Sequence, residues 1–142
     1  MSSSDVRPVR LSPPDLFDSS SFGFSPVVVA PRGCSLVFVS GQLANDHDAD
    51  FEHQVDDAFE NLRVALVAAG ATPQTVLRIS CLVVDHDPDR RAVVSRARRR
   101  FFSGEGPAST IVPVPRLAEA TALFEVDAIA MVDAVTPGTT GG

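Results

Sequence analysis

The 142-residue chain contains no lysine, no tyrosine and no tryptophan, and each absence removes a class of chemistry. Without lysine, no side-chain amine can form a Schiff base with a carbonyl substrate. Without tyrosine, no phenol can act as a general acid or base. The 12 residues counted as lysine and arginine are therefore all arginines.

The chain also lacks a positive charge balance and any long apolar run. Its net charge of -6 opposes non-specific binding to nucleic acid, and no apolar run approaches the ~20 residues of a membrane span. The serine-rich N-terminus lacks the apolar centre of a signal peptide. Two cysteines, Cys34 and Cys81, form no metal or disulfide pattern. We therefore expect a cytoplasmic protein that binds neither nucleic acid nor a membrane.

Hydrophobic periodicity predicts one α+β domain in the order β-β-α-β-α-β-β, with both helices on one face of a single sheet. Pro31, Arg32 and Gly33 are expected to join the first two strands as a hairpin. The predicted strands cover 27–30, 35–41, 75–85, 110–117 and 123–132, and the helices 51–69 and 88–102. The domain is assigned to 22–134, between a flexible arm (1–21) and a flexible tail (135–142).

Two features bear on how the sheet is used. Pro113 and Pro115 remove backbone donors from one side of a strand, which favours either a sheet edge or an irregular segment. The central strand over 75–85 shows no clean polar alternation, so the second sheet face should be apolar and covered by oligomerisation.

The segment SRARRR at 95–100 concentrates arginine on the second helix. On a helix these side chains point to several faces and do not line one groove. We interpret the segment as a solvated helix face, which the pattern favours over a phosphate- or RNA-binding patch.

Two carboxylates stand out in the last strand, LFEVDAIAMV. Glu125 and Asp127 share one face of the strand within an apolar run, where an unpaired charge is costly. They are either rim acids paired with Arg78 or Arg116, or Glu125 is a general acid or base whose pKa is raised by partial burial.

Other polar residues give weaker signals. Ser40 and Gly41 end a strand, where glycine lets a ligand approach the backbone, although these residues by themselves favour a simple strand-terminating turn. The histidines near the acidic loop over 44–50 do not form a metal-binding pattern. Cys81 is expected in the core, and no nucleophile elbow is present for a serine triad.

Five segments together resemble the reactive intermediate deaminase (Rid, YjgF-like) family: 36–44, 54–72, 76–85, 106–117 and 124–130. The resemblance implies a chorismate-mutase-like α+β fold with one mixed sheet, and a homotrimer with clefts between subunits. It also implies hydrolysis of imines or enamines to a ketone and ammonia, without a cofactor. In active members, an arginine binds the substrate carboxylate and a glutamate activates water.

The resemblance assigns roles to particular positions. The glutamate corresponds to Glu125 and the glycine to Gly41, but the position of the arginine holds Ser109. One hydroxyl cannot replace a bidentate arginine–carboxylate pair. Phe24 stands where an aromatic cleft residue is usual, and Asp87 where an asparagine is common.

We therefore expect a divergent small-molecule enzyme of a specialised bacterial pathway, and not a standard imino-acid deaminase. Glu125 would supply acid–base chemistry, while Ser40, Gly41, Ser109 and Thr110 orient the substrate. Without an arginine beside Ser109, the cleft should prefer a neutral or cationic ligand. The alternative is a non-catalytic ligand-binding or regulatory trimer, and the acidic charge balance disfavours a ribonuclease.

Overall fold

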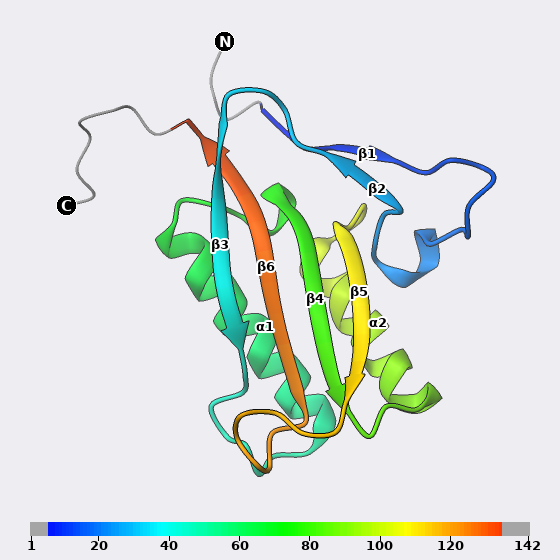
Figure 1. The fold of residues 1–142 in the computed structure, drawn as a ribbon, viewed down its shortest axis with the longest axis vertical. Coiled ribbons are helices and arrows are strands. Elements are labelled where there is room, and N and C mark those ends of the chain that lie inside the picture. The colour runs from blue at the N-terminus through cyan, green and yellow to red at the C-terminus, as the bar shows by residue number, and fades with distance from the viewer. Residues whose placement is uncertain (1–5, 135–142) are drawn as a thin grey trace.

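The computed structural model describes residues 6–134, which form an α+β fold with one mixed four-stranded sheet (Figure 1). The sheet order is β3-β6-β4-β5, and β1 and β2 form a separate two-stranded ribbon. The strands are β1 (Val9–Leu11), β2 (Val27–Val29), β3 (Cys34–Gln42), β4 (Val76–Val84), β5 (Ala108–Val114) and β6 (Phe124–Asp133). The helices are α1 (Phe51–Ala68), α2 (Pro88–Phe102) and the short 3-10 turns η2 (Ser20–Phe22) and η3 (Pro73–Thr75).

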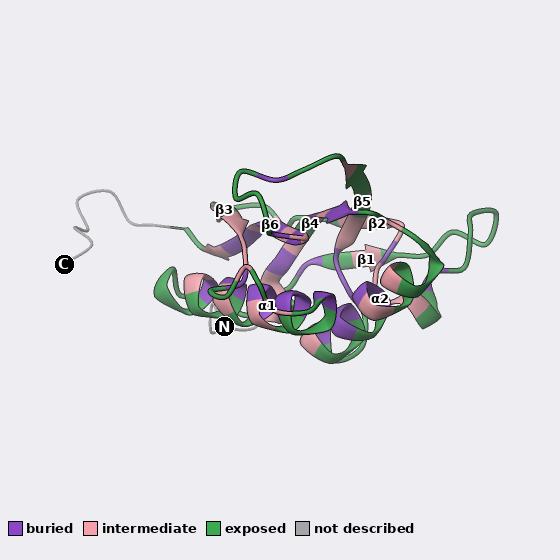
Figure 2. Cartoon of the chain, turned by 90° about the horizontal axis from the view of Figure 1, so that it is seen from below, coloured by how far each residue is buried: buried purple, intermediate pink, exposed green. Residues whose placement is uncertain are grey.

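Helices α1 and α2 lie side by side on one face of the sheet, as predicted (Figures 1 and 2). The Asp50 side chain caps α1 by accepting a hydrogen bond from the backbone N–H of His53 at 2.9 Å. Gly70 ends the helix with a φ of 80°, a value that glycine adopts without strain. The apolar stripe of α1 packs against the sheet through Val55, Phe59, Leu62 and Leu66.

An aromatic cluster joins the two helices to the sheet. The Phe59 ring stacks on Phe124 of β6 with centroids 5.9 Å apart, and it meets the edge of Phe102 of α2 at 6.5 Å. Burial of each such side chain contributes about 1.5–3 kcal/mol. This cluster fixes the position of α2, from which one of the site residues extends.

The pairing of the strands confirms one prediction and corrects another. The proline-containing β5 lies at a sheet edge and pairs in parallel with β4 alone. The predicted hairpin over 27–41 is wrong, because β2 pairs with β1 while β3 pairs with β6. The turn at Pro31–Gly33 therefore carries the chain from one sheet to the other.

The N-terminal segment contains secondary structure that the sequence did not predict. Val9–Leu11 pair with β2, and the backbone N–H of Ser25 donates to the carbonyl of Pro107 at 2.9 Å. The Ser25 hydroxyl donates to the Gly106 carbonyl at 2.6 Å. A Cβ at Gly106 would lie 2.0 Å from the carbonyl oxygen of Gly23, so the two backbones touch. The segment is thereby held against the loop that leads into β5.

The face of the sheet away from the helices, here called the open face, exposes large apolar side chains. Leu36 and Phe38 of β3 are 52% and 70% exposed, and Val112 of β5 is 39% exposed. This agrees with the apolar second face expected from the sequence. The predicted tail over 135–142 lies outside the described residues.

Within residues 6–134, none of the helices is both long and apolar enough to cross a lipid bilayer.

We predict that Ser25→Ala lowers the free energy of unfolding by about 1–3 kcal/mol, because the buried carbonyl of Gly106 loses its hydroxyl donor. Thermal or urea unfolding measures the change. Ser103→Ala is the control, since this exposed hydroxyl makes only a long bond of 3.3 Å and should change stability by less than about 0.5 kcal/mol. Equal effects of the two substitutions would show that the bond from the Ser25 hydroxyl to Gly106 adds nothing to stability.

Candidate functional site

Glu125 lies directly against Gly41. A Cβ at position 41 would be 2.3 Å from Glu125 Oε2, so a side chain there would displace the carboxylate from its present position. A β-bulge creates this contact: Val39 pairs with Ala128 and Gln42 with Val126, so Ser40 and Gly41 together oppose one residue of β6. Bulges of this kind are common beside active sites, because they redirect a strand and leave backbone groups outside the ladder.

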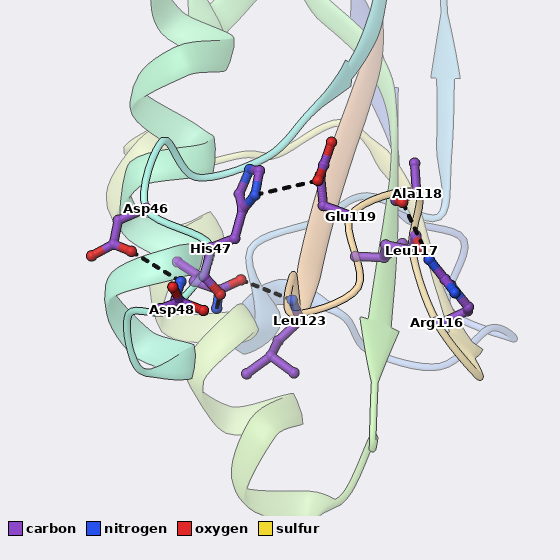
Figure 3. A network of polar contacts seen from close by, with 9 residues as sticks. Asp46, His47, Asp48, Arg116, Leu117, Ala118, Glu119 and Leu123 are labelled. Atoms are coloured by element: carbon purple, nitrogen blue, oxygen red, sulfur yellow. Dashed lines mark hydrogen bonds and ion pairs between the residues drawn. The ribbon is translucent and has the colours of Figure 1, made fainter.

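Partial burial raises the pKa of the Glu125 carboxyl, and the nearby Asp127 charge raises it further. Asp127 is the residue opposite the bulge, and its Oδ1 accepts a hydrogen bond from the backbone N–H of Ser80 at 3.2 Å. Neither carboxylate is paired with Arg78 or Arg116, so the alternative of arginine-matched rim acids does not hold. Arg116 instead donates to the carbonyls of Leu117 and Ala118 (Figure 3).

Both carboxylates belong to the open face, because their neighbours Phe124, Val126 and Ala128 enter the core on the helix side. A depression of about 290 Å³ lies beside Asp127 on this face. It is lined by Phe38, Val39, Arg78, Ser80, Asp127, Ala128 and Ile129. Thr110 also belongs to the open face, and its Oγ1 accepts a hydrogen bond from Arg78 Nη2 at 2.8 Å.

Ser109 is placed differently. It pairs with Ile79, which is fully buried on the helix side, and its Oγ accepts a hydrogen bond from Arg98 Nη1 of α2 at 3.1 Å. The Arg98 guanidinium also lies over the Phe24 ring, 5.0 Å from its centroid. The premise that no arginine stands beside Ser109 is therefore wrong, since helix α2 supplies one.

The interpretation of 95–100 as a solvated helix face is also wrong for Arg98, which is only 3% exposed. Arg96, Arg99 and Arg100 are exposed as expected. The helical spacing could have predicted the burial of Arg98. Position 98 lies four residues after Val94 and four before Phe102, both of which are buried. The burial lowers the pKa of the Arg98 guanidinium.

The chain does not bring all the predicted site residues together. Ser109 pairs with Ile79 of β4 and faces the helices, whereas Glu125 pairs with Leu82 and lies on the open face. Those two β4 positions are three residues, or about 10 Å, apart along the strand. Asp87 lies elsewhere, at the N-cap of α2, where its side chain accepts from the backbone N–H of Arg90 at 2.7 Å.

The histidine-containing loop has structural contacts. His47 Nδ1 lies 3.8 Å from a Glu119 carboxylate oxygen, and Gln54 donates to the His47 carbonyl at 3.0 Å (Figure 3). Gln54 Oε1 also accepts from the backbone N–H of Leu123, which ties the loop to the start of β6. In the part of the chain that the structure describes, no cluster of three or more potential metal ligands occurs. Cys81 is fully buried, and this burial raises the pKa of its thiol to about 12.

The chain is similar to known proteins over most of its length. Residues 20–132 match the family model described as Endoribonuclease L-PSP. The RutC family protein YjgH from Escherichia coli (strain K12) is 32% identical over 107 residues, which cover 72% of this chain and 80% of YjgH.

Three solved structures share the fold. The Rid family protein YyfB from Yersinia pestis has a TM-score of 0.83 at 27% identity, covering 89% of this chain and 99% of YyfB. Rv2704 of the YjgF/YER057c/UK114 family, from Mycobacterium tuberculosis, has a TM-score of 0.62 at 29% identity, with coverage of 88% and 99%. TdcF from E. coli, solved with bound serine, has a TM-score of 0.62 at 25% identity, with coverage of 77% and 93%. Since the family model covers residues 20–132 and these relatives share the sequence and the fold, the chain belongs to the Rid (YjgF, Endoribonuclease L-PSP) family.

Proposed function

We propose that the protein hydrolyses an imine or enamine intermediate in a cleft between subunits of a homotrimer. The observation that carries this proposal is the Glu125 carboxyl, which is held against Gly41 with a raised pKa beside an open apolar face. A carboxyl with a raised pKa exchanges protons more readily near neutral pH than an ordinary glutamate.

Two observations support the trimer. Leu36 and Phe38 expose apolar surface on the open face, which is the kind of surface that subunit contacts cover. Glu125 and Ser109 also lie on opposite faces of the sheet, so one chain does not surround a small ligand with both. A neighbouring subunit would bring the Ser109 side of one chain to the Glu125 side of the next.

The chemistry balances with substrate and water alone. The Glu125 carboxylate accepts a proton from water while the water oxygen bonds to the imine carbon. The imine nitrogen takes up a proton from solvent water, which gives a neutral carbinolamine. Glu125 then returns its proton to that nitrogen, the C–N bond breaks with its electron pair on nitrogen, and the hydroxyl releases its proton to solvent as the ketone forms. An enamine enters the same sequence after protonation at carbon, and the products are a ketone and ammonia.

The groups around Glu125 have complementary tasks. Gly41 leaves the space that the carboxylate occupies, and the bulge at Ser40 and Gly41 supplies backbone donors outside the ladder. Asp127 disfavours a second negative charge nearby, which keeps the Glu125 proton available for donation.

The second candidate is a ligand-binding or regulatory trimer without catalysis. It has in its favour that Arg98 and Ser109 form a polar site without needing Glu125. The two candidate functions predict different effects of removing the Glu125 carboxylate: the first predicts loss of hydrolysis, and the second predicts that the function of the protein is retained.

We predict that Glu125→Gln lowers kcat for hydrolysis of 2-iminobutanoate, generated in situ, by about 10²–10⁴-fold, because the amide cannot exchange the proton. Release of 2-oxobutanoate and ammonia measures the rate. Glu105→Gln is the control, because this carboxylate is 77% exposed, lies on the loop before β5 and forms an ion pair with Arg10 at 4.0 Å, away from Glu125. If the Glu125→Gln variant turns over the substrate at the wild-type rate, the proposed chemistry is contradicted. If the wild-type protein binds a ligand but shows no turnover, the non-catalytic candidate is favoured.

We also predict that Glu125→Gln stabilises the fold at neutral pH. Since the folded-state pKa of Glu125 is raised, the wild-type protein loses stability as the pH rises from about 4 through that pKa, whereas the glutamine variant does not. The variant should therefore have the higher Tm at about pH 7 and an equal Tm at about pH 3.5. Differential scanning calorimetry at both values checks this, and a lower Tm at pH 7 would mean that the carboxylate is stabilising.

A further inference from the structure

The Arg98 guanidinium is a buried positive charge without a negative partner. Arg98 is 3% exposed, and no aspartate or glutamate in residues 6–134 forms an ion pair with it. The neighbouring Cys81 thiol does not neutralise it, because burial holds the pKa of that thiol at about 12. Buried charges in proteins are usually paired, since desolvation costs several kcal/mol per ion.

Three hydrogen bonds to neutral groups fix the guanidinium. Nε donates to the Phe22 carbonyl at 3.2 Å, Nη2 to Ser95 Oγ at 3.2 Å, and Nη1 to Ser109 Oγ at 3.1 Å. The Phe24 ring covers the guanidinium at 5.0 Å. These contacts orient the charge but leave it uncompensated, and they connect it to two residues expected to bind substrate.

The bond to Ser109 sets the direction of its hydroxyl. A serine hydroxyl has one donor and two acceptor sites, and Arg98 occupies an acceptor site. The Ser109 hydrogen must therefore point to a different group, and donation from a cation makes that hydroxyl a stronger donor. Ser109 is only partly buried, so this donor is within reach of a ligand.

We propose that Arg98 is a specificity-determining positioning residue that acts through Ser109 and selects ligands carrying an anionic oxygen, such as a carboxylate. The ligand contacts the Ser109 hydroxyl, and the charge behind it offsets the negative charge of the ligand. This inference rests on the proposed function for the identity of the cleft. It replaces the expectation of a neutral or cationic ligand, which depended on the absence of an arginine near Ser109.

The arrangement differs from a direct arginine clamp in its geometry. A guanidinium that faces its ligand makes two parallel bonds to a carboxylate, whereas a serine hydroxyl makes one. Arg98 and Ser109 should therefore discriminate by charge while placing less constraint on the shape of the anionic group.

Arg78 is the competing source of positive charge. It lies on the open face and donates to Thr110 Oγ1 at 2.8 Å, one residue from Ser109. Because adjacent strand residues face opposite sides of a sheet, Arg78 and Arg98 approach β5 from different faces. Their substitutions therefore separate the two possibilities.

The test compares binding of 2-oxobutanoate and 2-oxobutanamide, which differ in the charged carboxylate, by isothermal titration calorimetry. The wild-type protein should bind the carboxylate at least about 10-fold more tightly, the discrimination expected of a charge-assisted hydrogen bond. Arg98→Met should raise the Kd of 2-oxobutanoate about 10-fold or more, with less than a 3-fold change for the amide. Ser109→Ala removes only the hydroxyl and should also abolish the preference for the carboxylate ligand. This variant therefore tests the inference if Arg98→Met fails to fold.

Arg78→Met is the matched control and should keep the preference. The inference is overturned if the wild type shows no preference for the carboxylate, if Ser109→Ala retains it, or if Arg78→Met alone removes it. These outcomes are separate from turnover. A carboxylate preference that depends on Ser109 supports the inference even when no hydrolysis is detected, and Glu125-dependent hydrolysis without charge preference refutes only the inference.

Discussion

The burial of one guanidinium without a carboxylate is the constraint on which this end of the molecule depends. Arg98 joins helix α2 to the N-terminal segment through the Phe22 carbonyl and the Phe24 ring, and to β5 through Ser109. The cost of desolvating a charge is several kcal/mol, so such a position persists only when surrounding contacts hold it in place. The aromatic cluster under α2 and the hydrogen bonds of Ser25 to the loop before β5 provide that support.

The opposite face of the sheet carries a second costly arrangement. Glu125 is partly buried, is repelled by Asp127 and holds its carboxylate in the space that a side chain at position 41 would take. Proteins commonly place strained or destabilised groups where function requires them. Two such arrangements in one small domain, on opposite faces of one sheet, are readily explained if the faces of different subunits meet around one ligand.

The helices, the main strands and the position of Glu125 could be predicted from the sequence, because the apolar residues of these elements recur at regular spacing. Alternation in β6 assigned Glu125 and Asp127 to a common face, and the spacing of apolar residues in α1 gave its buried stripe. The hairpin over 27–41 was mispredicted because turn residues reveal that a chain reverses but not which strand becomes its partner. The partner of β2 is β1, a three-residue strand within a serine- and proline-rich segment that has no strand periodicity.

Arg98 was missed for a different physical reason. Its charge predicts a solvent-exposed side chain, whereas its position on the helix predicts a buried one. The side chain is buried because Ser95, Ser109 and the Phe22 carbonyl accept its hydrogen bonds. Ser95 lies on the same helix, three residues before Arg98, but Ser109 and the Phe22 carbonyl become partners only when α2 meets β5 and the N-terminal segment. The helical spacing therefore placed Arg98 toward the interior, and the contacts from β5 and the N-terminal segment supplied acceptors that allow it to stay there.

The most direct test of the account asks whether the Glu125 side and the Arg98 side of a cleft come from different subunits. Glu125→Gln and Arg98→Met proteins would be unfolded together, refolded at equal amounts and assayed for hydrolysis of 2-iminobutanoate below KM. If neighbouring subunits contribute the two sides, random mixing leaves roughly a quarter of the clefts intact and activity returns to about that fraction of wild type. If the mixture is no more active than the average of the two variants refolded separately, the shared-cleft account is contradicted.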